Sequence, residues 1–245
     1  MRIALLLALT LLVSSPLPSV AMEPISLITE EWPPYNYTEN NVITGYSTEL
    51  VQLIIKELGI KEDIKIYPSM RATQTLETSK RTMLFSFIKT KEREKRYKWI
   101  GPFGSQSIHF YKRKNSSLVI QSIADAKKVN SICSRSGGLI FNKLNELGFK
   151  NLDTSTRAKS IYLKTIIGRC DLAISETALG YIHWMKELNQ PLDVLKETPV
   201  KVTEAPLYIV ATKDIPDSEI EMWQKALKKV INSKEYIKIA NKYGL

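Results

Sequence analysis

The order of apolar segments along the chain is the feature that most restricts its fold. Residues 25–88 alternate between apolar runs and helical stripes, with strands expected at 25–29, 63–67 and 83–88 and helices at 48–58 and 71–79. The last of these strands is apolar except at Ser86, which is typical of a strand covered on both faces. Three strands with two intervening helices form a βαβαβ pattern, the signature of a parallel α/β layer.

A second α/β unit follows an extended stretch at residues 108–111. Its elements are helices expected at 122–128, 137–147, 160–167 and 177–187, and strands at 129–133, 152–154 and 170–174. A strand at 207–212 and amphipathic helices at 218–231 and 234–241 end the chain, and these helices need an apolar face to cover.

The two units predict a two-lobed α/β protein in which each lobe is a mainly parallel sheet flanked by helices. We expect lobe one to comprise residues 22–107 and 207–245, and lobe two to comprise residues 108–206. Two linking strands, near residues 107 and 206, would join the lobes. The final helices would then return to lobe one.

Residues 1–21 predict a cleaved secretory signal peptide. Arg2 gives a positive start, residues 3–13 are apolar except for Thr10, and Ser-Val-Ala at 19–21 provides the small residues of a cleavage site. The apolar run is too short to span a bilayer. We therefore expect an exported protein.

Composition and motifs exclude several classes of function. Apolar residues make up 44% of the chain, and the net charge is +10. The basic runs at 89–98 and 112–114 are short or mixed with acids, and no RNA- or DNA-binding motif accompanies them. We therefore interpret the net charge as that of a basic soluble surface, and we expect no nucleic-acid partner. The motifs GxGxxG, GxxxxGKS, GxSxG and HExxH are absent. With two histidines far apart we expect no metal site and no cofactor.

Polar side chains follow four of the expected strands at their carboxyl ends, where open α/β sheets bind ligands. The segments are EEWPPYNY at 30–37, TKER at 90–93, RSGG at 135–138 and SE at 175–176. An arginine offers a planar fork of donors to a carboxylate, and a helix start offers free N–H groups to an anion. A buried glutamate needs a cationic partner. The pattern predicts a small zwitterionic ligand, with Arg93 at its carboxylate, Glu176 at its ammonium group and Trp32 against its carbon skeleton.

These motifs, in this order, resemble the family 3 bacterial extracellular solute-binding proteins, the periplasmic amino-acid receptors of ABC transporters. EEWPPYNY is similar to the family's aromatic-Pro-aromatic loop, and TGYSTEL at 44–50 to its entry to the first helix. Further similar segments are TKER with WIGPF at 99–103, GRCD at 168–171 with Glu176, and the C-terminal KEYIKIANKY at 234–243. The resemblance implies a type II periplasmic-binding fold, a monomer that closes over an amino acid, delivery to an ABC permease, and no catalysis.

The resemblance also implies roles for single residues. It places Arg93 on the ligand carboxylate, Glu176 on the amino group and Trp32 on the side chain. The residues at Ser86, Ser136 and Gly137 would form hydrogen bonds to the ligand.

The chain departs from the family pattern at several of these positions. Glu176 is longer than the usual aspartate, Thr29 stands where an acid is common, and Arg135 replaces a glycine. Arg71, in a segment similar to a W-x-R-A motif, adds a third arginine. The added cations indicate an acidic ligand or one with two carboxylates, or else an arginine that only braces Glu176.

Two other functions and one structural question stay open at this point. The same family includes periplasmic cyclohexadienyl dehydratases, in which Glu176 would be a general acid and Arg93 would hold the substrate carboxylate. An orphan ligand sensor of the same fold is the second alternative. Cys133 and Cys170 lie near the ends of neighbouring strands, and they can pair only if their Cα atoms lie within about 7 Å.

Overall fold

The computed structural model describes residues 23–175 and 177–244. The predicted signal peptide and Glu176 lie outside the described residues. Within the described part of the chain, no helix is both long enough and apolar enough to cross a membrane.

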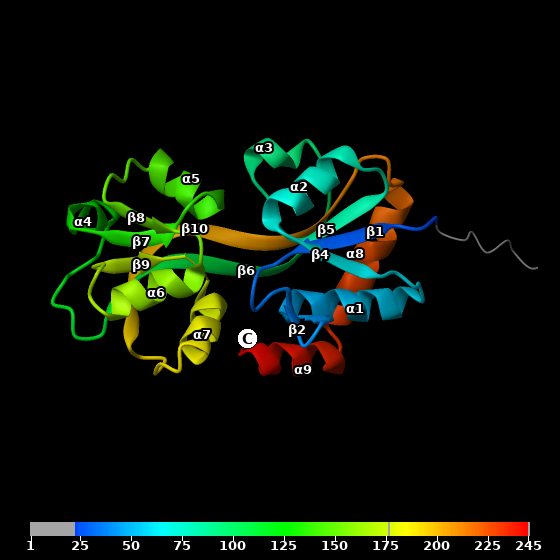
Figure 1. The fold of residues 1–245 in the computed structure, drawn as a ribbon. Helices are drawn as coiled ribbons and strands as arrows, with labels where there is room; N and C mark the ends of the chain where they lie inside the picture. Colours follow the sequence, from blue (N-terminus) through cyan, green and yellow to red (C-terminus); the bar gives the residue numbers. More distant parts are fainter. Residues whose placement is uncertain (1–22, 176, 245) are drawn as a thin grey trace, which may run out of the picture.

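Two α/β lobes lie side by side and are joined by two long strands (Figure 1). Lobe one contains strands β1 (Ser26–Glu30), β4 (Ile64–Tyr67) and β5 (Thr82–Ile88), the hairpin β2 (Tyr37–Glu39) and β3 (Val42–Thr44), and helices α1 (Tyr46–Leu58), α2 (Ser69–Thr78), α3 (Lys91–Glu94), α8 (Asp217–Ile231) and α9 (Lys234–Tyr243). Lobe two contains α4 (Ile123–Lys128), β7 (Ile132–Arg135), α5 (Gly138–Glu146), β8 (Leu152–Ser155), α6 (Ala158–Ile166), β9 (Leu172–Ile174) and α7 (Ala178–Glu187). The fold is the predicted two-lobed α/β class.

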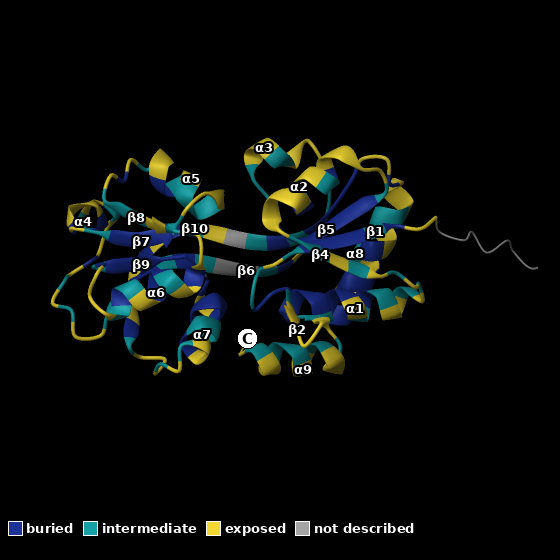
Figure 2. Ribbon diagram, in the orientation of Figure 1, coloured by how far each residue is buried: buried dark blue, intermediate teal, exposed yellow. Residues whose placement is uncertain are grey.

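The strands of both lobes form one eight-stranded sheet in the order β4-β1-β5-β10-β6-β9-β7-β8. The strands β1 and β5 of lobe one and β7 and β9 of lobe two are largely buried beneath the helices (Figure 2). In lobe one, β1 pairs in parallel with β4 and β5, and in lobe two β7 pairs in parallel with β8 and β9. The strands β6 (Lys98–Arg113) and β10 (Leu195–Ala211) pair with each other in antiparallel fashion and cross from one lobe to the other. Each lobe is therefore a parallel layer, as the βαβ pattern predicts, and the link between the lobes is antiparallel.

The linking strands are much longer than the sequence indicates. We expected only short extended stretches at 108–111 and 207–212, whereas β6 and β10 contain Pro102, Pro199 and Pro206, a residue type that normally interrupts a strand. The β6–β10 ladder instead continues past these prolines with register shifts, including one between Glu197 and Lys201. The predicted crossings near residues 107 and 206 fall inside these two strands.

The last two helices pack on lobe one. Trp223 of α8 is fully buried in the same apolar cluster as Leu50 and Ile54 of α1. At the end of α9, the Tyr243 hydroxyl donates a hydrogen bond to the Glu49 carboxylate of α1 at 2.7 Å. The chain therefore leaves lobe one through β6 and returns to it through β10.

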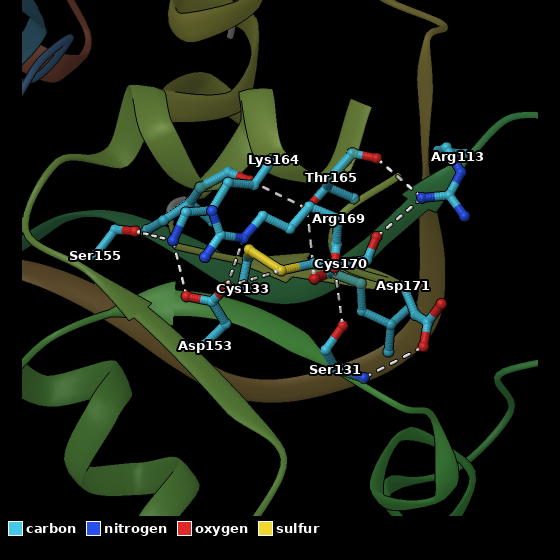
Figure 3. Close-up of a disulfide and its surroundings, with 12 residues drawn as sticks. Arg113, Ser131, Cys133, Asp153, Ser155, Lys164, Thr165, Arg169, Cys170 and Asp171 are labelled. Atoms are coloured by element: carbon cyan, nitrogen blue, oxygen red, sulfur yellow. Dashed lines mark hydrogen bonds and ion pairs between the residues drawn. A yellow bond between two sulfur atoms is a disulfide. The ribbon is translucent and has the colours of Figure 1, made fainter. Parts of the chain in front are cut away.

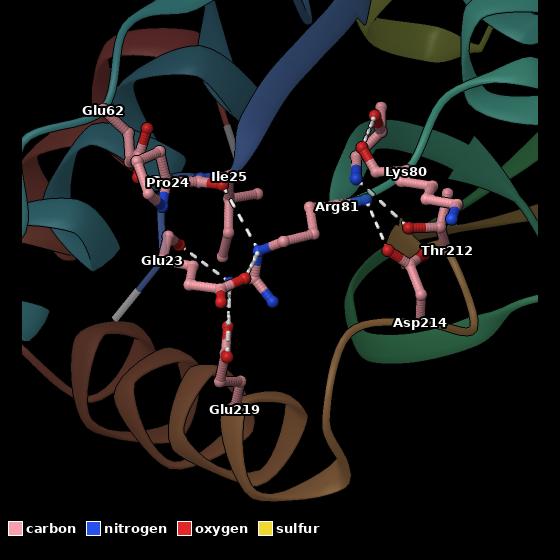
Figure 4. A network of polar contacts seen from close by, with 10 residues as sticks. Glu23, Pro24, Ile25, Glu62, Lys80, Arg81, Thr212, Asp214 and Glu219 are labelled. Atoms are coloured by element: carbon pink, nitrogen blue, oxygen red, sulfur yellow. Dashed lines mark hydrogen bonds and ion pairs between the residues drawn. The ribbon is translucent and has the colours of Figure 1, made fainter. Parts of the chain in front are cut away.

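Arg81 ties the start of the described chain to helix α8 (Figure 4). Its guanidinium forms ion pairs with Glu219 at 2.9 Å and Glu23 at 3.3 Å, and its backbone N–H donates to the Asp214 carboxylate at 2.8 Å. The Arg81 and Glu219 side chains are only 19% and 14% exposed. The pair is therefore better shielded from water than a surface salt bridge.

Replacing Glu219 by alanine is expected to lower the free energy of unfolding by about 2 kcal/mol, because a mostly buried guanidinium loses its closest counter-charge. Urea denaturation monitored by circular dichroism measures the change. Glu221→Ala, at an exposed position of the same helix, is the matched control and should have little effect. Equal denaturation midpoints for the two variants would contradict a stabilising role for the pair.

Cys133 and Cys170 form a disulfide, with their Cα atoms 5.7 Å apart (Figure 3). This resolves the question that the sequence leaves open. Cys133 lies in β7, whereas Cys170 lies just before β9 rather than in it.

Beside the disulfide, the Asp153 carboxylate accepts a hydrogen bond from Lys164 at 2.7 Å and lies 3.4 Å from the Arg169 guanidinium. Asp153 and the two sulfur atoms lie within 4.8 Å of one another, but the disulfide leaves no thiolate for a metal ion.

Candidate functional site

A pocket of about 360 Å³ lies between the two lobes. Its lobe-one wall consists of Glu30, Glu31, Trp32, Ser69, Met70, Thr73, Ser86, Phe87, Ile88 and Arg93. The opposite wall consists of Ile108 of β6 and, from lobe two, Arg135, Ser136, Gly137, Gly138, Leu139, Ile140 and Ser175. Six of the eight predicted site residues line it: Trp32, Ser86, Arg93, Arg135, Ser136 and Gly137. Its volume is in the range of small-molecule sites.

The aromatic loop after β1 holds Trp32 at the pocket wall. The loop is closed by hydrogen bonds between the backbones of Trp32 and Asn36, at 2.6 and 3.1 Å. Tyr35 is fully buried and its ring centroid lies 4.5 Å from that of Trp32, while Trp32 itself stays partly exposed. The Tyr35 hydroxyl also forms a 2.5 Å hydrogen bond with Thr177 of lobe two. Tyr35 is thus the buried support and Trp32 the ring that faces the pocket.

Asn36 connects this loop to the floor of the pocket. The Ser86 hydroxyl donates a hydrogen bond to the Asn36 side-chain oxygen, and the Asn36 amide donates to the backbone carbonyl of Glu30. Asn36 is fully buried, and Ser86 is 1% exposed with a backbone φ of 62°. A left-handed backbone is uncommon for a residue other than glycine. Asn36 therefore fixes the positions of two pocket residues, although the sequence shows it only as one polar residue between two tyrosines.

Arg93 is held against lobe one by its own neighbours. Its guanidinium carbon lies 4.2 Å from the centre of the Phe87 ring, and its Nη1 donates to the Ile88 carbonyl at 3.2 Å. Burial lowers the pKa of Arg93, and the negative charge of Glu30 partly offsets this. Arginine remains protonated in proteins. The pocket therefore contains a fixed cation with further donors available.

The lobe-two wall is the end of β7 and the start of α5. Arg135 is the last residue of β7, and the Ser136 N–H donates to the Ser155 carbonyl at 2.9 Å. Gly137 has a φ of 79° and precedes α5 without any side-chain cap. Backbone N–H groups in the first turn of an uncapped helix have no partner within that helix. This wall therefore combines a cation with free backbone donors.

Two predicted site residues are not among the described residues that line the pocket. Arg71 lies outside the pocket, with its guanidinium carbon 4.8 Å from the centre of the Tyr67 ring. Side chains three and four positions apart share one face of a helix, so Ser69, Met70 and Thr73 of α2 face the pocket while Arg71 is turned away. Glu176 lies outside the described residues, although its neighbour Ser175 lines the pocket.

Glu30 is a pocket residue that our sequence analysis did not select. It is the last residue of β1, so the rule that placed the other candidates at strand ends applies to it as well. Burial raises the pKa of the Glu30 carboxyl, whereas the Ser69 hydroxyl and the charges of Arg135 and Arg93 favour its ionised form. The described pocket thus carries a partly buried acid whose charge is influenced by Arg93 and Arg135.

Comparison with known proteins identifies the family. Residues 25–245 match the model of the bacterial extracellular solute-binding proteins, family 3, and the chain belongs to this family. It is 25% identical over 223 residues to the probable amino-acid-binding protein YxeM of Bacillus subtilis strain 168, covering 86% of this chain and 79% of that protein. The predicted family is therefore confirmed.

Solved structures share the fold at low sequence identity. A histidine kinase sensor domain with similarity to periplasmic binding proteins superposes with a TM-score of 0.75 at 15% identity, over 90% of this chain and 96% of that chain. The substrate-binding protein of an amino acid ABC transporter gives a TM-score of 0.70 at 18% identity, over 89% and 98% of the two chains. The type II periplasmic-binding fold expected from the sequence is confirmed.

Proposed function

We propose that this protein is an exported, periplasmic receptor that captures a carboxylate-bearing solute, an amino acid, between its lobes and delivers it to an ABC permease. The lobes are residues 22–107 with 207–245 and residues 108–206, and the protein acts as a monomer without catalysis. The family of extracellular solute-binding proteins supports export and capture. The amino-acid-binding relative and the ABC-transporter neighbour support the ligand class and the partner.

The observation that carries this proposal is the pairing of cations across the pocket. Arg93 comes from lobe one and Arg135 from lobe two, and both line the same cavity with the uncapped start of α5. A carboxylate between them accepts donors from both lobes at once, so binding favours the closed arrangement of lobes. Trp32 provides an apolar wall for the ligand's carbon skeleton, and Ser86 and Ser136 provide hydroxyl groups. Glu176 is proposed as a partner of the ligand's amino group.

A thermal-shift screen across amino acids, dicarboxylates and polyamines tests this function. A cognate amino acid at one hundred times its Kd should stabilise the protein by about 2.7 kcal/mol. Polyamines lack a carboxylate and are expected to leave the melting temperature unchanged. Stabilisation by polyamines alone, or by none of the amino acids, would refute the proposal.

The likeness to a kinase sensor domain favours one second candidate, a ligand sensor that contacts a signalling protein instead of a permease. Uptake of the radiolabelled ligand by cells with and without the gene separates the two. A transport receptor predicts loss of uptake on deletion. Unchanged uptake with a lost transcriptional response would indicate the sensor.

A further inference from the structure

The disulfide of lobe two lies beside an acid on the neighbouring strand (Figure 3). Cys133 of β7 stands opposite Asp153 of β8 in the parallel register, and Cys170 comes just before β9, on the other side of β7. The Asp153 carboxylate oxygen Oδ2 lies 3.9 Å from the Cys170 sulfur, and the three potential ligand atoms all lie within 4.8 Å of one another. Three segments of lobe two thus bring two sulfur atoms and a carboxylate together.

These distances are close to those of a tetrahedral zinc site. Zn–S bonds of about 2.3 Å and Zn–O bonds of about 2.1 Å place the ligand atoms of a tetrahedral ion roughly 3.6–3.8 Å apart. The separation between Asp153 and Cys170 is already near this value, so only the two sulfur atoms have to move apart once the bond between them is broken. The cysteine Cα atoms are 5.7 Å apart, which exceeds the required sulfur separation, so rotation of the side chains can provide it.

The acid lies on the solvent side of this cluster. Both cysteines are fully buried, whereas the Asp153 side chain is 28% exposed. Asp153 therefore lies between the sulfur atoms and the solvent, which gives a metal ion an entry path and a place for a water molecule as fourth ligand.

The charges around the cluster favour ionised ligands. Lys164 donates a hydrogen bond to Oδ1 of Asp153 at 2.7 Å, and Nε of Arg169 lies 3.4 Å from Oδ2. The hydrogen bond from Lys164 lowers the pKa of the Asp153 carboxyl, and the charge of Arg169 acts in the same direction. Cations beside a thiol favour the thiolate in the same way. A carboxylate offers about four acceptor sites, so these two contacts leave capacity for a metal ion.

We propose that reduction of the disulfide converts this cluster into a zinc site whose ligands are Cys133, Cys170 and Asp153. A dithiol supplies two electrons and two protons to the sulfur–sulfur bond and leaves as its own disulfide, so that two thiols form. Zn²⁺ then displaces the two thiol protons and binds the thiolates and the carboxylate, which are ligand types that this ion accepts. The metal ion holds β7 and the segment before β9 together in place of the covalent bond. None of the three ligands is among the residues that line the pocket, so the inference does not depend on the proposed function.

Metal titration of the reduced and the oxidised protein tests this site. The protein is reduced with dithiothreitol, separated from it under nitrogen, and titrated first with Co²⁺ and then with Zn²⁺. The reduced wild type should bind one ion per chain and show the thiolate-to-cobalt charge-transfer bands of a tetrahedral site, which Zn²⁺ abolishes. The oxidised protein and the Cys133→Ala, Cys170→Ala double variant should not show these bands.

Single substitutions separate a metal ligand from an ion-pair partner. Asp153→Asn should weaken zinc binding by about tenfold or more in competition with a chromogenic chelator, since changes to the partners of metal ligands already cost that much. Lys164→Ala breaks the same ion pair but keeps all three ligands, and should bind zinc at least as tightly as the wild type. Asp193→Asn makes the same change at an acid paired with Lys114 on the surface, and should have no effect.

Several results would overturn the proposed zinc site. A reduced wild type that binds neither ion refutes it, whether or not the reduced protein keeps its fold. Unchanged zinc binding in Asp153→Asn removes Asp153 from the ligands, and an equal loss in Asp153→Asn and Lys164→Ala shows that the acid acts only through its ion pair. Equally tight binding by the double variant or by the oxidised protein places the metal elsewhere. Circular dichroism before each titration shows that the variants are folded.

Discussion

Replacing Arg93 by alanine is expected to weaken binding of carboxylate ligands by about a hundredfold or more. Truncating one partner of a buried, hydrogen-bonded charge pair costs about 2–5 kcal/mol, because the other charge is left without its partner. The contacts of Arg93 with Phe87 and the Ile88 carbonyl fix its guanidinium before a ligand enters. Little ordering of this side chain then remains to oppose binding. Calorimetric titration with the amino acid that the screen identifies measures the loss.

Two further variants make this measurement specific. Arg71→Ala removes the same type of side chain from the same lobe, but at a position where it lies on Tyr67 and outside the pocket. It should leave the affinity unchanged. Arg93→Lys keeps the charge and loses the planar fork, and should give an intermediate loss. Equal affinities for wild type and Arg93→Ala would refute the role proposed for Arg93.

Removing the disulfide is expected to lower the free energy of unfolding by about 4 kcal/mol. The bond joins residues 37 positions apart, and a cross-link of this span reduces the conformational entropy of the unfolded chain by about this amount in the chain-entropy model. Both cysteines are fully buried, so alanine at both positions avoids placing a new polar group in the core. Urea denaturation of the Cys133→Ala, Cys170→Ala double variant measures the effect.

Reduction of the wild-type protein provides the matching control. Dithiothreitol should lower the denaturation midpoint of the wild type towards that of the double variant and leave the variant itself unchanged. The ion pairs of Asp153 with Lys164 and Arg169 do not depend on the sulfur atoms and should persist. A loss below about 1 kcal/mol would show that the disulfide adds little to the stability of lobe two.

The sequence predicted those parts of the site that depend on local rules. Parallel strands place their carboxyl ends at one edge of a sheet, so the residues that follow β1, β5 and β7 were expected to meet. Trp32, Arg93 and Arg135 do line one pocket. Glu30 obeys the same rule, but no local pattern indicates that this acid is partly buried and influenced by the charges of two arginines.

Other features depend on contacts between distant segments. Ser69 and Arg71 are two residues apart on α2, and only the packing of that helix decides that the first faces the pocket and the second faces Tyr67. The chain beyond Pro199 stays in the sheet because β6 lies alongside it with a compensating register shift. The length of β10 therefore depends on its pairing with β6, and the residues of β10 alone do not predict it.

By itself, the sequence determined the two parallel α/β units, their order and the strand ends that form the site, because apolar periodicity and turn residues act over a few positions. The tertiary structure alone decided the disulfide, the length of the linking strands, the orientation of Arg71 and the place of Glu30. These depend on distances between residues far apart in the chain, which are set when the lobes pack and not by any local pattern.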